Sequence, residues 1–241
     1  MAQGPSFSVA GLHVLISGGT GGIGSAFTRA FVAHGARVTV ADLKPAAAGA
    51  LPDGVAFETL DVTSDAAVEA LAARIEKLDV LIHCAGKLSR WEEHKIDVFK
   101  EIVDIHLFGN VRLAGAFRPH LKASRGCIIN IGSMYSYFGA PQVPAYASAK
   151  TAIIGLTKSL AIAYAEDGIR VNAIAPGWIA TDISRHGREN PVFNAAVMQR
   201  LPSKAWAEAD ELAGTAVFLA SPASALINGV TIPVDGGYVA S

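Results

Sequence analysis

The sequence predicts an α/β fold, a single-domain doubly wound parallel sheet of about seven strands with helices on both faces. Short apolar runs typical of buried strands alternate with longer stretches in which apolar residues recur at helical spacing. The first run leads into a glycine-rich turn and then a helix, and no internal repeat interrupts the order. With 241 residues and 51% hydrophobic content, the chain can build one large core, so we expect one domain over residues 1–241.

Charge and composition exclude several function classes. The net charge of −1 offers no general attraction to nucleic acid or to an anionic membrane, which favours a small neutral or anionic ligand. No apolar run reaches the ~18 to 20 residues of a membrane span, and residues 1–5 lack the basic start of a signal peptide. Cys84 and Cys127 fall at opposite ends of their strands, on the order of 15 Å apart, so no disulfide is expected. We therefore expect a cytoplasmic protein.

The first half of the chain alternates strands with helices. Helices are expected after the glycine turn, up to the stop at Gly35, and over residues 65–76, where Thr63 or Ser64 offers a cap. A short crossover rich in Ala and Pro covers residues 44–52. This order indicates parallel βαβ units with right-handed crossovers. The expected strands are residues 12–17, 36–41, 55–59 and 79–84.

The glycine turn over residues 18–24 is typical of a nucleotide site. Because it lies between a strand and a helix, a pyrophosphate can approach bare backbone and meet the unpaired N–H groups at the start of the helix. Asp42 ends the next strand, about 20 residues beyond the turn. A carboxylate there can accept both ribose hydroxyls of NAD and repels the 2′-phosphate of NADP, although Lys44 can soften this discrimination. We therefore expect NAD as the cofactor.

The second half carries longer helices. Residues 92–122 read as one long helical stretch with a core-facing apolar stripe. A helix runs from Pro144 to about residue 166, and a polar, irregular segment is expected over residues 178–191. Residues 178–200 together should cover the substrate. The remaining expected elements are strands at 127–131, 169–175 and 229–234 and helices at 192–200 and 208–219.

A tyrosine and a lysine stand four residues apart in the helix after Pro144. Tyr146 and Lys150 therefore project from one helix face. A nearby cation favours phenolate over phenol, so a tyrosine with an ordinary pKa of ~10 can act as an acid or base closer to neutrality. Ser133, after the strand at 127–131, can hold a substrate oxygen beside that phenol. The three residues predict a site that moves a proton onto or off an alcohol oxygen, with an ordinary surface helix as the alternative for the spacing alone.

In these motifs the chain resembles the short-chain dehydrogenase/reductase family, in the branch with the longer glycine spacing. Gly18-x-x-x-Gly22-x-Gly24 resembles its cofactor loop, and Ser133 with Tyr146-x-x-x-Lys150 resembles its active site. Asp61-Val62 resembles the adenine contact, residues 172–177 the nicotinamide-side loop and residues 234–237 the C-terminal strand. The resemblance covers residues 8–239 and implies a Rossmann-type fold. The cofactor-binding residues that it implies are Gly18, Thr20, Gly21, Gly22, Ile23, Gly24, Asp42, Leu43, Asp61, Val62, Cys84, Ala85, Gly86, Tyr146, Lys150, Pro176, Gly177, Ile179 and Thr181.

The resemblance implies an NAD-dependent alcohol dehydrogenase or ketone reductase. Tyr146 is then the base in oxidation and the acid in reduction, and Ser133 orients the substrate oxygen. Lys150 holds the nicotinamide ribose and lowers the pKa of the tyrosine. Hydride passes between the carbinol carbon and nicotinamide C4, while the protein supplies geometry and charge. The resemblance also implies a homotetramer, or a dimer, built through the long helices and the C-terminal strand.

Two positions depart from the family pattern. His106 stands where the family carries an asparagine that anchors a water leading from the active-site lysine to solvent. A neutral imidazole can also hold a water, and its ordinary pKa of ~6.5 lets it pass a proton on. A working relay, a structural histidine and impaired catalysis all stay open. His83-Cys84 replaces an Asn-Asn pair before Ala85-Gly86, and a zinc site from His83, Cys84 and His106 is not expected because the spacing matches no zinc motif.

The segment over residues 178–200 carries a slight basic excess, which favours a carboxylate or a hydroxylated ligand. Tyr135, Gln142, Trp178 and Arg185 are the candidate substrate residues, with solvated loop residues as the alternative for each. Polyols, sugars and sugar acids form the first substrate class, cyclic or aromatic alcohols the second and 3-oxoacyl thioesters the third. A non-catalytic protein that senses NAD(H) is a further alternative, against which the intact serine, tyrosine and lysine argue.

Overall fold

The computed structural model describes residues 6–47 and 49–241, and its centre is one seven-stranded sheet. The strand order is β3-β2-β1-β4-β5-β6-β7, and every neighbouring pair is parallel. The order reverses between β1 and β4, so the doubly wound sheet predicted from the sequence is confirmed. The strands are β1 (His13–Ser17), β2 (Arg37–Asp42), β3 (Ala56–Thr59), β4 (Val80–His83), β5 (Cys127–Ile131), β6 (Arg170–Pro176) and β7 (Thr231–Val234).

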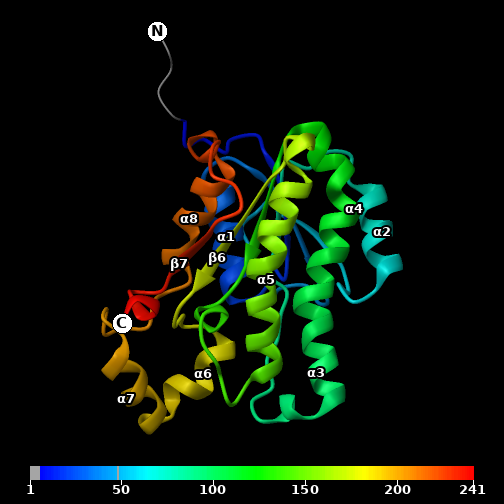
Figure 1. The fold of residues 1–241 in the computed structure, drawn as a ribbon. Helices are drawn as coiled ribbons and strands as arrows, with labels where there is room; N and C mark the ends of the chain where they lie inside the picture. Colours follow the sequence, from blue (N-terminus) through cyan, green and yellow to red (C-terminus); the bar gives the residue numbers. More distant parts are fainter. Residues whose placement is uncertain (1–5, 48) are drawn as a thin grey trace.

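Helices cover both faces of this sheet (Figure 1). One face packs against α1 (Gly22–Ala33) and α8 (Asp210–Ala220). The other packs against α2 (Asp65–Arg74), α4 (Gly109–Ser124) and α5 (Pro144–Ala163). Two shorter helices, α6 (Asp182–Glu189) and α7 (Pro191–Arg200), lie at the end toward which the β6 arrow points in Figure 1. They therefore cover the carboxyl ends of the strands.

The central strands have no solvent-facing side. In β1, Val14 and Ile16 belong to the core on the α1 and α8 face, whereas Leu15 between them belongs to the opposite core. Side chains alternate across a strand, so a strand covered on both faces needs apolar residues on both of its faces. This is why the sequence shows these strands as continuous apolar runs.

The helical stretch expected over residues 92–122 is not one helix. A 3₁₀ turn (Glu92–His94) is followed by α3 (Ile96–Val103), then by a π-helical turn (Asp104–Phe108), and only then by α4. Lys95 has an extended backbone, which separates the 3₁₀ turn from α3. A π turn inserts one extra residue into a helix and is often found at functional sites. Here the inserted turn contains His106.

The prediction of an irregular segment over residues 178–191 was wrong, because α6 lies within these residues. The hydroxyl of Ser184 accepts a hydrogen bond of 3.0 Å from the Thr181 N–H, which closes the first turn of α6. Asn190 ends α6, and its side chain accepts a 3.0 Å hydrogen bond from the Phe193 N–H to cap α7. Local capping therefore outweighs the polar composition of the segment.

The sequence also led to expectations about the two cysteines, about membrane-spanning helices and about residues 1–5. Cys84 and Cys127 are free thiols, and Cys127 pairs in register with Val80, four positions before Cys84. Among the described helices, none is both long and apolar enough to cross a bilayer. The expectation about residues 1–5 falls outside the described residues.

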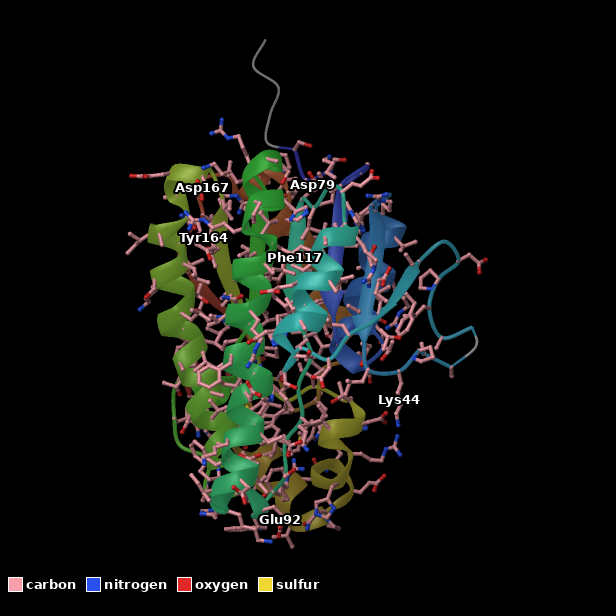
Figure 2. All side chains as sticks on the ribbon, turned by 90° about the vertical axis from the view of Figure 1, so that its right-hand side faces the viewer. Lys44, Asp79, Glu92, Phe117, Tyr164 and Asp167 are labelled. Atoms are coloured by element: carbon pink, nitrogen blue, oxygen red, sulfur yellow. The ribbon has the colours of Figure 1, made fainter. Side chains whose placement is uncertain are left out.

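Phe117 on α4 is fully buried against the sheet and allows a test of the packing (Figure 2). Phe117→Ala should lower the free energy of unfolding by about 3 to 5 kcal/mol, because it removes apolar contact and leaves a cavity. Urea denaturation followed by circular dichroism would measure the change. Lys158→Ala, at an exposed position on α5, is the control and should change stability by less than about 0.5 kcal/mol. A loss below about 1 kcal/mol for Phe117→Ala would contradict this packing.

Candidate active site

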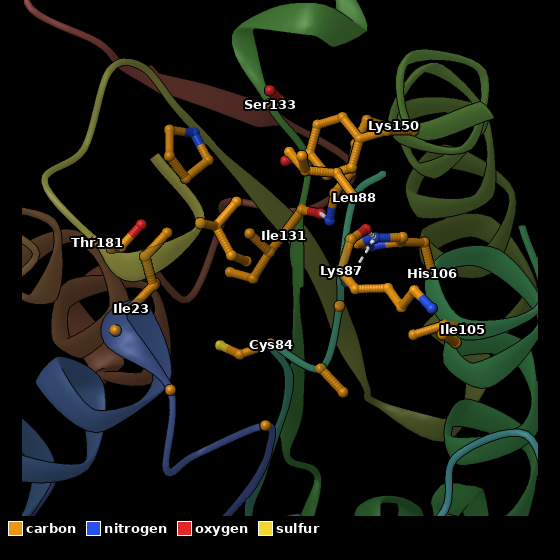
Figure 3. Close-up of a pocket in the computed structure, with 18 of the residues that line it drawn as sticks. Ile23, Cys84, Lys87, Leu88, Ile105, His106, Ile131, Ser133, Lys150 and Thr181 are labelled. Carbon is orange, nitrogen blue, oxygen red and sulfur yellow. Dashed lines mark hydrogen bonds between the residues drawn. The ribbon is translucent and has the colours of Figure 1, made fainter. Parts of the chain in front are cut away.

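A cavity of about 770 Å³ opens at the carboxyl ends of the strands, beside the point where the strand order reverses. Figure 3 shows Ile23 and Thr181 on one side of it and Lys150 and His106 on the other. Of the site residues expected from the sequence, only Arg185 is not part of the cavity wall. The residues that do line it are Gly18, Thr20, Gly21, Gly22, Ile23, Gly24, Asp42, Leu43, Asp61, Val62, Cys84, Ala85, Gly86, His106, Ser133, Tyr135, Gln142, Tyr146, Lys150, Pro176, Gly177, Trp178, Ile179 and Thr181.

The glycine turn brings bare backbone to the cavity wall at the start of α1. Gly18 has a φ of +69°, and a Cβ there would lie 2.4 Å from the Ala85 nitrogen. A Cβ on Gly22 would lie 2.5 Å from the Thr181 side chain, so the turn also touches the segment before α6. Side chains at these positions would block both contacts. The result is a cradle of N–H groups at a helix N-terminus, which fits a pyrophosphate.

Asp42 lies where the ribose of a dinucleotide bound to this turn is expected. Its carboxylate accepts a 2.5 Å hydrogen bond from the Thr20 hydroxyl and a 2.8 Å hydrogen bond from the Leu43 N–H. These bonds fix the carboxylate on the cavity wall. Lys44 is exposed and lies at the edge of the molecule (Figure 2), outside the cavity lining. It therefore does not neutralise Asp42 inside the cavity.

Ser133, Tyr146 and Lys150 converge on one wall of the cavity. Tyr146 lies in the first turn of α5, and its ring centroid is 5.5 Å from the Lys150 Nζ. The Ser133 side chain lies within reach of the Tyr146 hydroxyl, since hydrogen bonding by Ser133 lowers the pKa of that phenol. Ser136, which the sequence analysis missed, connects the two elements: its hydroxyl accepts from the Ser133 N–H at 3.2 Å and donates to the Lys150 carbonyl at 2.6 Å. The serine turn and the tyrosine helix are thus fixed to each other.

Burial dominates the ionisation of these groups. Burial raises the pKa of Tyr146, and the hydrogen bond from Ser133 opposes this rise only in part. We expected the neighbouring ammonium to lower the pKa of Tyr146. This expectation was wrong, because the sum of all effects raises that pKa. Burial also lowers the pKa of Lys150 to about 8. The Lys150 Nζ donates a 2.7 Å hydrogen bond to the Ile131 carbonyl, which helps to keep its charge inside the protein.

His106 lies on the π turn and faces Tyr146. The two rings meet edge to face with their centroids 5.1 Å apart. The Nε2 of His106 lies 2.8 Å from the Lys87 carbonyl (Figure 3) and 3.3 Å from the Lys87 nitrogen. The shorter of these two contacts is a hydrogen bond when Nε2 carries the proton, which we take as the tautomer. Nδ1 is buried and makes no hydrogen bond with any described residue. Burial, followed by the charge of Lys150, holds the pKa of His106 well below its ordinary value, so the ring is neutral.

His83 fixes the backbone of the π turn. Its Nδ1 lies 2.6 Å from the Ser17 hydroxyl, and its Nε2 lies 3.1 Å from the Ile105 carbonyl. Burial, followed by the charge of Lys150, lowers the pKa of His83 to about 4, so this ring is also neutral at physiological pH. Among the described residues, no three His, Cys, Asp or Glu side chains gather closely enough to hold a metal ion.

The basic residue that lines the cavity beside α6 is not the expected one. Arg185 forms an exposed ion pair with Asp182 and does not line the cavity. Arg90, from the loop after β4, lines the cavity instead. The sequence contained no pattern that distinguishes Arg90 from other loop residues, because its position depends on how the loop after β4 meets α6.

Comparison with known proteins agrees with this geometry. A family model described as enoyl-(acyl carrier protein) reductase matches residues 18–239. A 2-dehydro-3-deoxy-D-gluconate 5-dehydrogenase of Bacillus subtilis (strain 168) is 36% identical and covers 97% of both chains. The D-threitol dehydrogenase of Mycolicibacterium smegmatis is 32% identical, over 96% of this chain and 94% of its own. The crystal structure of a gluconate 5-dehydrogenase from Burkholderia cenocepacia J2315, in complex with NADP and tartrate, has a TM-score of 0.90 and 30% identity and covers 98% of both chains.

The relatives are oxidoreductases that act on alcohols or ketones of small hydroxylated molecules, and the matches span almost the whole chain. The fold agrees with that of the gluconate 5-dehydrogenase of known structure. This chain is an NAD(P)-dependent oxidoreductase and belongs to the short-chain dehydrogenase/reductase family.

Proposed function

We propose that this enzyme interconverts a secondary alcohol and its ketone on a polyol, sugar or sugar acid, with Tyr146 as the group that transfers the proton. The observation that carries the proposal is the convergence of Ser133, Tyr146 and Lys150 on one wall of a cavity whose other wall is the glycine turn. The nicotinamide cofactor held by that turn supplies the hydride acceptor or donor.

Each of the three residues has a distinct task. The Ser133 hydroxyl holds the substrate oxygen beside the phenol. In oxidation the Tyr146 oxygen takes the hydroxyl proton of the alcohol, and in reduction it returns a proton to the carbonyl oxygen. Lys150, with a pKa of about 8, carries a positive charge at neutral pH and favours the phenolate against the effect of burial. Its ammonium is also the group that we expect to contact the nicotinamide ribose.

His106 is proposed to relay protons between the site and solvent. Its Nε2 is committed to the Lys87 carbonyl, while its buried Nδ1 offers a lone pair to a water molecule. Because the ring stays neutral, it works by holding this water rather than by storing a proton. The edge contact with Tyr146 supports this position in the relay.

For the cofactor we propose a preference for NAD over NADP. The Asp42 carboxylate is fixed by Thr20 and Leu43 on the cavity wall, where it accepts ribose hydroxyls and repels a 2′-phosphate. The gluconate 5-dehydrogenase of known structure binds NADP, so the choice for this chain rests on Asp42.

The names of the relatives favour a hydroxylated substrate for this chain over an acyl thioester, because the relatives act on sugar acids and polyols. The family model itself is described by an acyl-carrier reaction.

We infer a homotetramer from the family resemblance. Exposed apolar side chains on α4 and α5, including Val111 at 47% and Ile162 at 79% exposure, support an interface there. A cytoplasmic location stays a prediction from the sequence.

Tyr146→Phe should lower kcat by about 10²- to 10⁴-fold, because it removes the proton-transferring oxygen. NADH absorbance with a panel of polyols and sugar acids measures the rate, and tryptophan fluorescence confirms that NADH still binds. Substantial activity in the Phe variant would remove the phenol from the mechanism.

In the wild type, oxidation should accelerate as pH rises above neutrality, because the phenolate is the base and burial raises the Tyr146 pKa. Reduction needs the neutral phenol and should decline at high pH.

Asp42→Ala should shift the ratio of kcat/KM for NAD to kcat/KM for NADP by about tenfold or more toward NADP, since the repelling carboxylate is lost. Steady-state rates with each cofactor measure the ratio. Lys44→Ala is the matched control and should leave the ratio within about twofold, because Lys44 lies outside the cavity lining. An unchanged ratio in Asp42→Ala would show that this carboxylate does not select the cofactor.

His106→Asn should keep most of the activity, since an amide can also hold a water, whereas His106→Leu should lose about tenfold or more in kcat. Thermal unfolding of each variant checks that the fold is intact. Equal rates in the wild type and both variants would show that His106 only fills space.

A further inference from the structure

Arg90 lies where the catalytic cavity meets a second hollow. It lines both spaces, and Leu88, Gln142 and Phe193 are shared between them. The second hollow continues under α6 and α7 and includes His186 and Asn190. A molecule longer than the reacting group can therefore extend from Tyr146 past Arg90.

The guanidinium of Arg90 has no partner among the described side chains. It forms no ion pair or side-chain hydrogen bond with any residue of the described ranges, although it is half-buried. The other cations of the cavity wall are committed: Lys87 pairs with Glu101 at 2.6 Å, and Lys150 is hydrogen-bonded to the Ile131 carbonyl. A partly desolvated guanidinium without a carboxylate leaves donors unused. Among the Lys and Arg side chains of the described cavity wall, Arg90 is thus the one whose N–H groups are available to a ligand.

Two observations locate this guanidinium between the catalytic tyrosine and α6. On one side, its Nη2 lies 3.8 Å from the position of a Cβ on Gly187 of α6. On the other side, its positive charge lowers the pKa of Tyr135, against the larger effect of burial, which raises that pKa to about 12. The Tyr135 ring meets the Tyr146 ring edge to face, with centroids 6.4 Å apart. Arg90 therefore lies on the side of the cavity where Tyr135 connects α6 to the catalytic tyrosine.

The loop that carries Arg90 is held rigidly. The fully buried carboxylate of Glu93 accepts hydrogen bonds from the Ser89 N–H at 2.9 Å and from the Tyr146 N–H at 2.8 Å. Trp91, the residue after Arg90, has a left-handed backbone with a φ of +65° and donates its N–H to the Gln142 carbonyl at 2.7 Å. Such strained conformations persist where the surroundings fix them, often at ligand clamps. Glu93 thereby ties the arginine loop directly to the first turn of the tyrosine helix.

We propose that Arg90 is a specificity-determining residue that binds the carboxylate of the substrate, so that the enzyme acts on a polyhydroxy acid in preference to the neutral polyol. This inference rests on the proposed function. A carboxylate matches the planar fork of one guanidinium, with two parallel N–H···O bonds. A phosphate carries more charge and is usually held by several cations, whereas the other two cations of the described cavity wall, Lys87 and Lys150, already have partners. With the carboxylate on Arg90, a hydroxyl further along the same carbon chain reaches Ser133 and Tyr146.

The test compares aldonates with the alditols of the same carbon skeleton, for example D-gluconate with D-glucitol, using NAD⁺ and NADH absorbance. The wild type should favour the aldonates in kcat/KM by about tenfold or more. Arg90→Gln should lower kcat/KM for aldonates by about tenfold or more, mainly through KM, and should change the alditol values by less than about twofold. Arg90→Lys, which keeps the charge and loses the fork, should fall between them. Arg185→Gln is the matched control and should leave both series unchanged.

Calorimetric titration of aldonates into the enzyme with NADH makes the result independent of turnover. Aldonate binding that weakens about tenfold or more in Arg90→Gln supports the subsite. Equal use of aldonates and alditols by the wild type, an equal loss on both in Arg90→Gln, or no aldonate binding would overturn it. If alditols are oxidised and Tyr146→Phe abolishes this, the proposed function stands even when the subsite fails. If nothing is oxidised but aldonates bind through Arg90, the subsite stands and the proposed function fails.

Discussion

The hydrogen bond between the Lys150 ammonium and the Ile131 carbonyl sets the electrostatics of the site. A buried cation is costly unless its donors are paired, and this carbonyl at the end of β5 provides a partner. The charge in turn disfavours any second positive charge nearby. It contributes to the low pKa values of His83 and His106, so that one cation is surrounded by neutral rings. The tyrosine, whose acidity burial weakens, then has this ammonium as its cationic neighbour.

The chemistry depends on this arrangement being rigid. Ser136 connects the serine turn to α5, and Glu93 connects the loop after β4 to the same helix. His83 holds the π turn in place through the Ile105 carbonyl. The segments that follow β4 and β5 are therefore fixed to α5 and to the sheet by buried polar contacts. Such contacts keep the reacting groups in place without a rearrangement at the moment of reaction.

Most of the sheet was predictable from the sequence, because strands covered on both faces carry apolar residues on both of them. The residues of the cavity wall were predictable where a motif has a fixed spacing, as in the glycine turn or in Tyr146 and Lys150. The helix α6 was missed, since its polar sequence is stabilised by a cap at Thr181 rather than by an apolar stripe. The direction of the Tyr146 pKa was also missed, because burial depends on how distant elements pack. For the same reason the sequence favoured Arg185, whereas the structure brings Arg90 to the cavity.

The contact between Gly86 and His106 links two positions that are 20 residues apart in the chain. A Cβ on Gly86 would lie 2.2 Å from the Cε1 of His106, so the ring occupies the space that any larger residue at position 86 would need. Each position therefore limits what evolution can accept at the other. A smaller side chain at position 106 has to appear before position 86 can vary, and the reverse order leads through a clashing intermediate. The histidine thus makes the mutational path of this active site dependent on order, a case of epistasis that arises from steric exclusion alone.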